Sequence, residues 1–164
     1  MFKYLFKMKK ILLLFSFFIG VLAMAQMPDI SNVFLNKNKS YSGKLLEADQ
    51  NLFVTISNAT QSKTNDQEYF VSGTTKAGNV IKPFEGKITI TKYKDGKKRS
   101  TVYGEYDFAE GGTDEHSGEL KGKFIFTFKW NAKLEKVEDQ FIQFTGKWTN
   151  YKKTLQYRTL WDNQ

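Results

Sequence analysis

Apolar and polar residues alternate with a period of two along most of the chain from residue 41 onward. The clearest stretch is 116–130, where the even positions from Gly118 to Trp130 are glycine or apolar and the odd positions are mostly charged or polar. The same alternation returns over 84–93 and 101–108. Successive side chains of a strand point to opposite faces, so the pattern predicts strands with one buried and one wet face.

Short polar segments divide this region into about eight strands, with no long helix between them. Lys94-Asp95-Gly96 separates two strands whose apolar residues are all even-numbered. A three-residue turn with Gly96 in the left-handed conformation keeps those residues on one face. Open sheet edges invite aggregation, so the strands need closure. The sequence therefore predicts an all-β fold, an antiparallel up-and-down meander that closes into a small β-barrel.

Gly86, Gly104 and Gly122 recur at intervals of 18 residues, each with a large apolar residue two places on either side. Folding the neighbouring strands into hairpins places Gly86 opposite Gly104, and Gly104 opposite Gly122. A glycine row of this kind is typical of a bend that lets a sheet close into a barrel. It leaves either a pocket on the inner face or a space that another side chain, such as Phe34, fills.

The last hairpin turns over residues 150–153 and is expected to place Trp148 opposite Leu155 and Gly146 opposite Tyr157. An aromatic ring opposite a glycine compensates for the missing side chain.

The meander and the Gly-x-apolar repeats resemble the lipocalin and avidin group of small barrels. Residues 145–150, TGKWTN, look like the first strand of avidin, although here they lie on the next-to-last strand. The resemblance implies that Trp148 packs at the barrel wall and that Asn150 contacts the head group of a ligand, biotin in avidin. The whole chain also resembles small secreted bacterial β-proteins that have no assigned activity.

The N-terminus has the pattern of a secretory signal peptide. Lys9 and Lys10 precede an apolar run over residues 11–24, which ends in Ala23-Met24-Ala25. A positive segment, a short apolar core and an A-x-A site predict cleavage before Gln26. The apolar run is short for a membrane span. We therefore expect export to the periplasm or the extracellular space, with no stable membrane anchor.

The chain is therefore expected to consist of three segments. Residues 1–25 form the signal peptide, and residues 41–164 form a single barrel domain. Residues 26–40 form an N-terminal segment that is a short helix or is disordered. In the helical alternative, Asp29 caps a helix that carries Ile30, Val33 and Phe34 on one face.

Charge and cysteine content narrow the classes of function. The full chain has a net charge of +8, but four lysines and no acidic residues lie in 1–25, which leaves 21 basic and 17 acidic residues and a net charge of +4. With export, this small excess argues against a nucleic-acid partner. The chain has no cysteine, which excludes disulfides, a lipid-anchored cysteine, thiol catalysis and cysteine-ligated zinc.

The remaining charged clusters are interpreted as solvent-facing. His116, the one histidine, follows Asp114 and Glu115 in a loop that we expect to include Glu110. Their spacing matches no known metal site, so a solvated hairpin loop is preferred to a cation site. Other acidic side chains lie on polar strand faces, where cross-strand ion pairs explain them better than glycosidase carboxylates: Glu85, Glu105, Asp107 and Glu119.

A basic hairpin tip is interpreted as a charged turn that favours solubility rather than a polyanion site: Lys92, Lys94, Lys97, Lys98 and Arg99. No catalytic motif is present, and we expect neither an enzyme nor a cofactor or metal.

The leading hypothesis is an exported barrel that binds a small, largely apolar ligand in its interior. The expected ligand-contacting residues flank the glycine row or belong to the TGKWTN strand: Phe84, Tyr106, Leu120, Phe124 and Trp148. One alternative is a filled-core barrel that acts through its surface as a protein-interaction or inhibitor module. A second alternative is a small outer-membrane barrel with the apolar face toward lipid.

Overall fold

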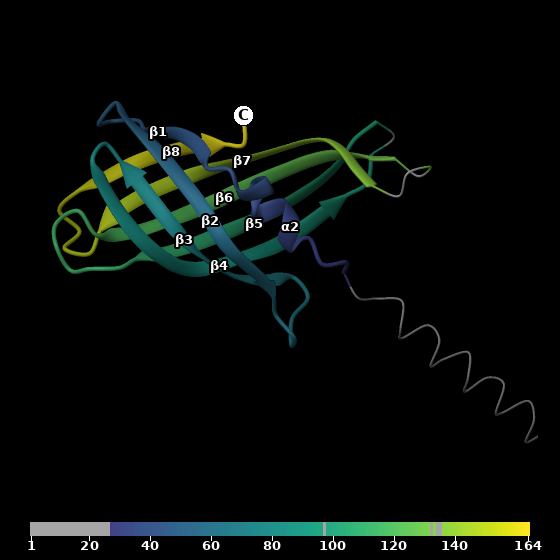
Figure 1. Ribbon diagram of the computed structural model, residues 1–164, viewed down its shortest axis with the longest axis horizontal. Helices are drawn as coiled ribbons and strands as arrows, with labels where there is room; N and C mark the ends of the chain where they lie inside the picture. Colours follow the sequence, from purple (N-terminus) through teal and green to yellow (C-terminus); the bar gives the residue numbers. More distant parts are fainter. Residues whose placement is uncertain (1–26, 97, 132, 134–135) are drawn as a thin grey trace, which may run out of the picture.

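Eight antiparallel strands form a closed barrel in chain order, with β8 pairing back to β1 (Figure 1). The computed structural model describes residues 27–96, 98–131, 133 and 136–164. The strands are β1 (Tyr41–Leu45), β2 (Gln50–Gln61), β3 (Glu68–Ala77), β4 (Val80–Lys94), β5 (Ser100–Glu110), β6 (Gly118–Asn131), β7 (Lys136–Asn150) and β8 (Gln156–Asp162). The predicted fold class, an antiparallel up-and-down barrel, is confirmed. The predicted signal peptide and its cleavage point before Gln26 lie outside the described residues.

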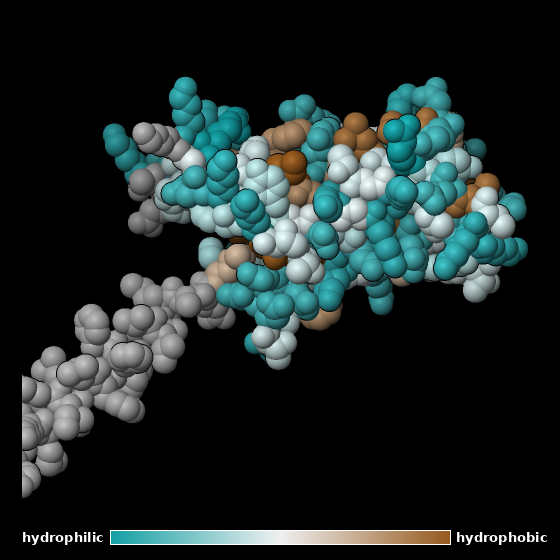
Figure 2. Space-filling view, turned by 180° about the vertical axis from the view of Figure 1, so that it is seen from behind, coloured by the Kyte–Doolittle hydropathy of each residue, from teal (hydrophilic) through white to brown (hydrophobic). Residues whose placement is uncertain are grey.

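The period-two pattern of the sequence assigns the two faces of the barrel wall. On β5, Tyr106 and Phe108 are buried, whereas the neighbouring Glu105 and Asp107 are exposed. Asp107 pairs with Lys121 of β6 at 3.3 Å, as expected for a cross-strand ion pair on the wet face. On the face seen in Figure 2, hydrophilic residues cover much of the surface, with hydrophobic ones scattered among them. Removal of apolar area from water therefore favours this closure.

Aromatic side chains fill the middle of the barrel. The rings of Phe144 and Trp161 stack with centroids 3.7 Å apart, and Tyr106 meets both rings edge-on. Tyr41 also contacts both rings edge-on, from β1. Interiors of eight-stranded barrels are just wide enough to be filled by side chains. The central part of this interior is accordingly core rather than pocket.

The N-terminal segment is ordered and contributes to this core. It contains a short helix, α2 (Ser31–Phe34), and a 3₁₀ turn, η1 (Asn36–Asn38). Phe34 is fully buried and packs edge-on against Tyr69 and Phe124, with centroids 5.1 and 5.7 Å away. The Tyr41 hydroxyl donates to the carbonyl of Phe34 at 2.8 Å. Of the two alternatives for this segment, the short helix is the one observed.

The start of α2 differs in detail from the prediction. Asp29 accepts a hydrogen bond from the backbone amide of Ser31 at 2.8 Å, but the residue at the N-cap position is Ile30. The Ile30 amide in turn donates to the Tyr69 hydroxyl at 3.2 Å, which fastens the segment to β3. Met27 is held in the same region by Asp66, in the loop between β2 and β3. Among the described residues, no helix is long and apolar enough to cross a membrane.

The predicted glycine row is wrong in its register. Gly104 lies opposite Ile90 rather than Gly86. The bulge between Ile90 and Lys92 changes the pairing of β4 with β5 by only one residue and does not account for this difference. Across the next pair of strands, Gly104 lies opposite Phe124 rather than Gly122. The cause in the β4–β5 pair is the connection after Lys94, which is longer than the expected three-residue turn because β5 begins only at Ser100. These local irregularities have no signature in the alternation pattern.

The glycines instead leave room for aromatic rings on the neighbouring strand. A Cβ atom at Gly104 would collide with the ring of Phe124, and one at Gly86 would lie 2.8 Å from the ring of Phe108. An aromatic ring covering a strand glycine replaces the packing that the glycine lacks. The space at these positions is occupied by the protein itself.

Two further pairings differ from the expected ones. In the last hairpin, Trp148 pairs with Tyr157 rather than Leu155, and Gly146 pairs with Thr159 rather than Tyr157.

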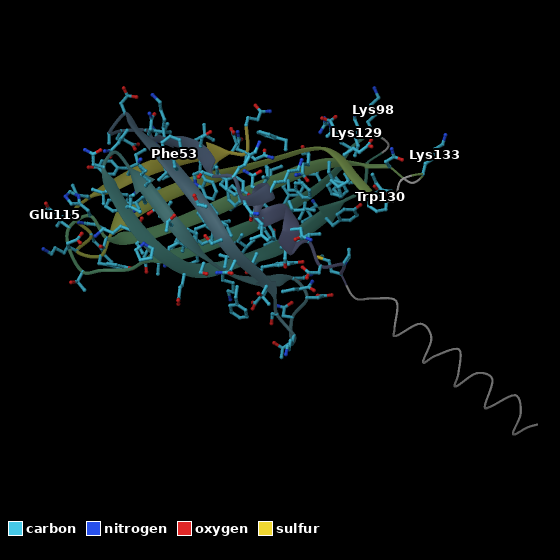
Figure 3. The ribbon with its side chains drawn as sticks, viewed as in Figure 1. Phe53, Lys98, Glu115, Lys129, Trp130 and Lys133 are labelled. Carbon is cyan, nitrogen blue, oxygen red and sulfur yellow. The ribbon has the colours of Figure 1, made fainter. Side chains whose placement is uncertain are left out.

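Trp130, assigned to the inner face by its even number, is 56% exposed. A register shift in the β6–β7 pair lies between Thr127 and Lys129, immediately before it. Beyond this point β6 and β7 form a projecting hairpin, which carries Trp130, Lys129 and Lys133 near Lys98 of the β4–β5 hairpin (Figure 3).

Part of the basic tip has a structural role. Arg99 donates to the backbone carbonyl of Asp139 at 2.8 Å and also pairs with its carboxylate. Lys129 reaches the same carboxylate at 2.8 Å. The Arg99 contacts join the β4–β5 and β6–β7 hairpins, whereas the Lys129 pair lies within the β6–β7 hairpin. Such exposed ion pairs stabilise a protein only slightly.

Candidate ligand site at the barrel mouth

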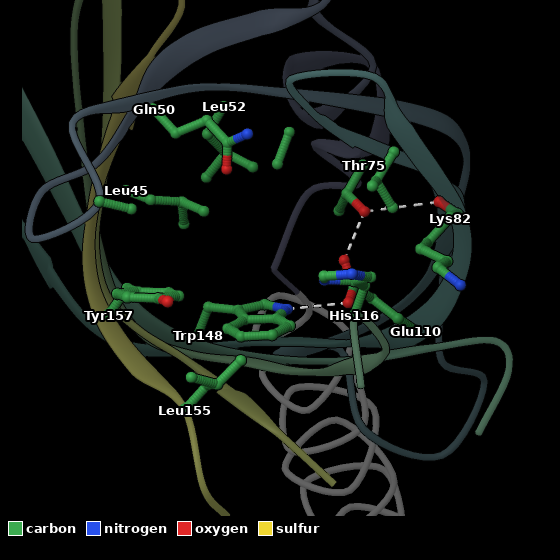
Figure 4. A pocket seen from close by; sticks show the side chains of 13 residues that line it. Leu45, Gln50, Leu52, Thr75, Lys82, Glu110, His116, Trp148, Leu155 and Tyr157 are labelled. Atoms are coloured by element: carbon green, nitrogen blue, oxygen red, sulfur yellow. Dashed lines mark hydrogen bonds between the residues drawn. The ribbon is translucent and has the colours of Figure 1, made fainter. Parts of the chain in front are cut away.

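A cavity of about 200 Å³ opens at the end of the barrel formed by the hairpins β1–β2, β3–β4, β5–β6 and β7–β8 (Figure 4). The N-terminal segment lies toward the other end, by the β2–β3 loop. Each of the four hairpins contributes to the lining, mostly with apolar side chains, among them Leu45, Leu52, Val80, Trp148, Leu155 and Tyr157. An up-and-down barrel brings alternate hairpins to the same end, which is why residues distant in sequence meet here.

Glu110, the last residue of β5, is the buried charged side chain of this cavity. It is 6% exposed, and its carboxylate accepts three hydrogen bonds. One oxygen, Oε2, accepts from the indole Nε1 of Trp148 at 2.8 Å and from the amide of Gly118 at 3.1 Å. The other oxygen, Oε1, accepts from the hydroxyl of Thr75. Figure 4 shows the Trp148 and Thr75 bonds converging on Glu110 from two sides of the cavity.

Burial raises the pKa of the Glu110 carboxyl above its usual value near 4.5, because a charged group is poorly solvated there. The three hydrogen bonds and the positive charge of Lys82 act in the opposite direction. The Thr75 hydroxyl also lies 3.5 Å from the carbonyl of Lys82. When Glu110 is protonated, its carboxyl group can donate to the Thr75 hydroxyl, and that hydroxyl can donate to the Lys82 carbonyl.

Two aromatic rings form the wall beside Glu110. The rings of Trp148 and Tyr157 are stacked, with centroids 5.8 Å apart and planes inclined by 12°. The hydrogen bond to Glu110 fixes the orientation of the Trp148 indole. The cavity thus combines a flat aromatic wall with a single acidic group, an arrangement suited to small-molecule recognition.

The rim of the cavity carries an ion pair and a histidine beside a carboxylate. Lys82 pairs with Asp114 across the β5–β6 loop, and His116 lies 3.5 Å from Glu115. Among the described residues, no group of three or more His, Cys, Asp or Glu side chains is arranged to hold a metal ion.

The residues expected to contact a ligand fall into two groups. Trp148 lines the cavity. Phe84, Tyr106, Leu120 and Phe124 are buried in the aromatic core, where Phe84 stacks on Phe108 and Phe124 packs on Phe34. The structure therefore brings only Trp148 of these five to the barrel mouth.

The expected loop position of Glu110 is wrong, and sequence reasoning missed its role. The inward face of β5 runs through Gly104, Tyr106 and Phe108 in even-numbered steps, and Glu110 continues that series. The alternation therefore contained the signal. An acidic residue in an inward position was interpreted as the start of a polar loop, because charged side chains are rarely buried.

Asn150, the last residue of the TGKWTN segment, stabilises a turn. Its side-chain oxygen accepts hydrogen bonds from the amides of Thr154 and Leu155 at 2.9 and 3.0 Å. Its amide nitrogen donates to the Thr154 hydroxyl at 2.9 Å. The side chain for which the resemblance implies a contact with a ligand head group is thus bonded within the β7–β8 hairpin, and it also donates to the carbonyl of Glu115 at 3.4 Å. Trp148 lies in the barrel wall, as the resemblance implies.

No family model matches this chain, and neither a curated protein nor a solved structure shows significant similarity to it. The fold alone therefore defines its class. It is a small, closed, eight-stranded antiparallel barrel, an architecture consistent with lipocalin-like barrels.

Proposed function

We propose that this protein is an exported, non-enzymatic barrel that binds a small, largely apolar ligand at its mouth. The observation that carries the proposal is the mostly apolar cavity closed off below by the aromatic core and furnished with one buried carboxyl group, that of Glu110. Such a cavity offers an apolar environment and one orienting polar contact, as small-molecule sites commonly do.

The volume of the cavity restricts the size of the ligand. At about 200 Å³ it is below the usual range of about 300–1000 Å³ for drug-sized ligands. It exceeds the roughly 150 Å³ that suffices for benzene in an engineered protein cavity. A ligand with one ring or a short chain therefore fits, whereas a long fatty acid or a polycyclic molecule requires more space.

The orientation of the barrel faces favours this proposal over an outer-membrane barrel. Charged side chains such as Lys121, Lys123 and Lys147 point outward from the middle of β6 and β7. The rings of Phe124, Phe126 and Phe144 on the same strands are buried in the interior. A lipid-spanning barrel needs the opposite arrangement around its middle.

The proposal is tested by titrating ¹⁵N-labelled protein with toluene. We expect chemical-shift changes concentrated at the Trp148 indole N–H and the Gly118 amide, both bonded to Glu110 at the cavity. Ala77→Phe should fill the cavity, which Ala77 lines, and abolish these changes. The matched control is Ala109→Phe, which makes the same substitution at an exposed position on β5. If the folded wild type shows no localised changes, the alternative of a barrel acting through its surface becomes the better explanation.

A further inference from the structure

The carboxylate of Glu110 has no cationic partner within the described part of the chain. Its hydrogen bonds come from a hydroxyl, an indole and a backbone amide, all of them neutral donors. Lys82 is the cation whose charge acts on it, but the Lys82 ammonium group pairs with Asp114. Buried charges in proteins are normally paired, because desolvation of an isolated charge is costly.

One acceptor position of the carboxylate remains for a ligand. A carboxylate offers about four lone-pair positions, and three are used here. Oε2 accepts two bonds, whereas Oε1 accepts only that of Thr75. Because Glu110 lines the cavity, a donor group inside the cavity can reach this oxygen.

The surroundings of this oxygen favour a positive charge over a negative one. The stacked pair of Trp148 and Tyr157 lines the same cavity, and aromatic faces attract organic cations. Lys82 and Asp114 at the rim cancel one another in charge, and His116, which also lines the cavity, lies 3.5 Å from the Glu115 carboxylate. The Glu110 carboxylate is therefore the charge in the cavity that no ion pair among the described residues offsets. A carboxylate ligand would face repulsion from Glu110 or require its protonation.

We propose that the ligand is a small organic amine, with its ammonium group bound to Glu110 and its apolar part against Trp148 and Tyr157. The proposal rests on the function proposed above and specifies the chemical class of the ligand. In this proposal Glu110 selects the ammonium group of the ligand, and the rest of the cavity holds its apolar part.

The test compares three ligands that share a ring and a two-carbon chain and differ in the terminal group: 2-phenylethylamine, 2-phenylethanol and 3-phenylpropionate. Dissociation constants are measured at neutral pH from the shift of the Trp148 indole N–H. A charge-assisted hydrogen bond should make the amine bind about tenfold or more tightly than the alcohol. Among the three ligands, 3-phenylpropionate should bind most weakly, because its carboxylate is repelled by that of Glu110.

Glu110→Gln is the decisive variant. A glutamine can keep all three hydrogen bonds of Glu110, because its amide group can donate to Thr75 while the Thr75 hydroxyl turns to the Lys82 carbonyl. The amine should lose its advantage in this variant, while the affinity for the alcohol stays nearly unchanged. Glu105→Gln, the same substitution on the outer face of β5, is the control and should leave both affinities unaltered.

The outcomes separate the two proposals. Equal affinities of the wild type for the amine and the alcohol would refute amine selectivity and leave the apolar-ligand function standing. Amine selectivity that survives in Glu110→Gln would refute the role of Glu110. Failure of both compounds and of toluene to bind folded wild type would overturn the proposed function itself. If Glu110→Gln does not fold, the comparison of the three ligands on the wild type still decides the inference.

Discussion

At the scale of single residues, the environment of Glu110 is the feature that most separates this barrel from a plain aromatic core. Glu110 ends the inward-facing series of residues on β5, which is otherwise apolar at this end. Desolvation opposes ionisation of its carboxyl group, whereas three hydrogen-bond donors favour ionisation. Such opposed influences are common at binding and catalytic sites, although structural networks also produce them. The amine proposal gives this group a role that packing alone does not supply.

The raised pKa of Glu110 predicts a pH dependence of stability. The folded state holds this proton more tightly than the unfolded state, whose pKa is near 4.5. The stabilising contribution is therefore complete below the unfolded pKa and is lost as the pH rises through the folded pKa. The free energy of unfolding of the wild type, relative to that of Glu110→Gln, should fall as the pH increases from 4.5.

Urea titrations of both proteins between acidic and neutral pH measure this difference. Carboxylates whose pKa is lowered by exposed ion pairs, such as Asp49 and Asp139, are common to both proteins and cancel in the comparison. A constant difference between wild type and Glu110→Gln across the range would contradict the prediction.

Close contact between Gly104 and the ring of Phe124 gives a second residue-scale prediction. Gly104→Ala places a Cβ where the ring lies, and overpacking of this kind costs about 1–3 kcal/mol. Phe124→Leu should relieve the part of the collision that the ring makes, whereas the contact of the Cβ with the backbone carbonyl of Thr89 remains. The two substitutions should therefore be partly non-additive in a double-mutant cycle measured by denaturant unfolding. Additive effects would mean that the ring does not occupy the space left by the glycine.

At the scale of elements, the N-terminal segment acts as part of the barrel core rather than as a leader. Phe34 is the side chain that the segment inserts between Tyr69 and Phe124. Phe34→Ala should destabilise the protein by about 3–5 kcal/mol, the usual cost of truncating a fully buried phenylalanine. Asn32→Ala, an exposed position of the same helix, is the control. A loss below about 1 kcal/mol by denaturant unfolding would show that the barrel is stable without this insertion.

At the scale of the whole molecule, export remains a proposal that rests on residues 1–25. We expect the mature chain to begin at Gln26, one residue before the segment that contacts the β2–β3 loop through Met27. Intact-mass analysis of protein recovered from the periplasm or the culture medium measures the cleavage point directly. Retention of residues 11–24 in a membrane fraction would contradict it.

The fold class could be predicted because a period of two assigns every side chain to a face whatever the pairing of the strands. Apolar residues such as Tyr106, Phe108 and Phe124 were therefore correctly placed inside the barrel. The same pattern does not determine the pairing. The connection after Lys94 is longer than the expected turn and moves every pair of β4 and β5, and this is why the expected alignment of Gly86 with Gly104 failed.

The sequence by itself determined the alternation, the number of strands and their up-and-down order, since each depends on residues close together in the chain. Only the tertiary structure decided where the interior is filled and where it is open. Phe34 fills the barrel from another element, and Glu110, Trp148 and Thr75 meet at the mouth from three different strands. Such contacts depend on strand register and barrel closure, and these depend in turn on the length of every turn and the position of every bulge along the chain. For this reason the candidate site could be recognised only after folding had brought its parts together.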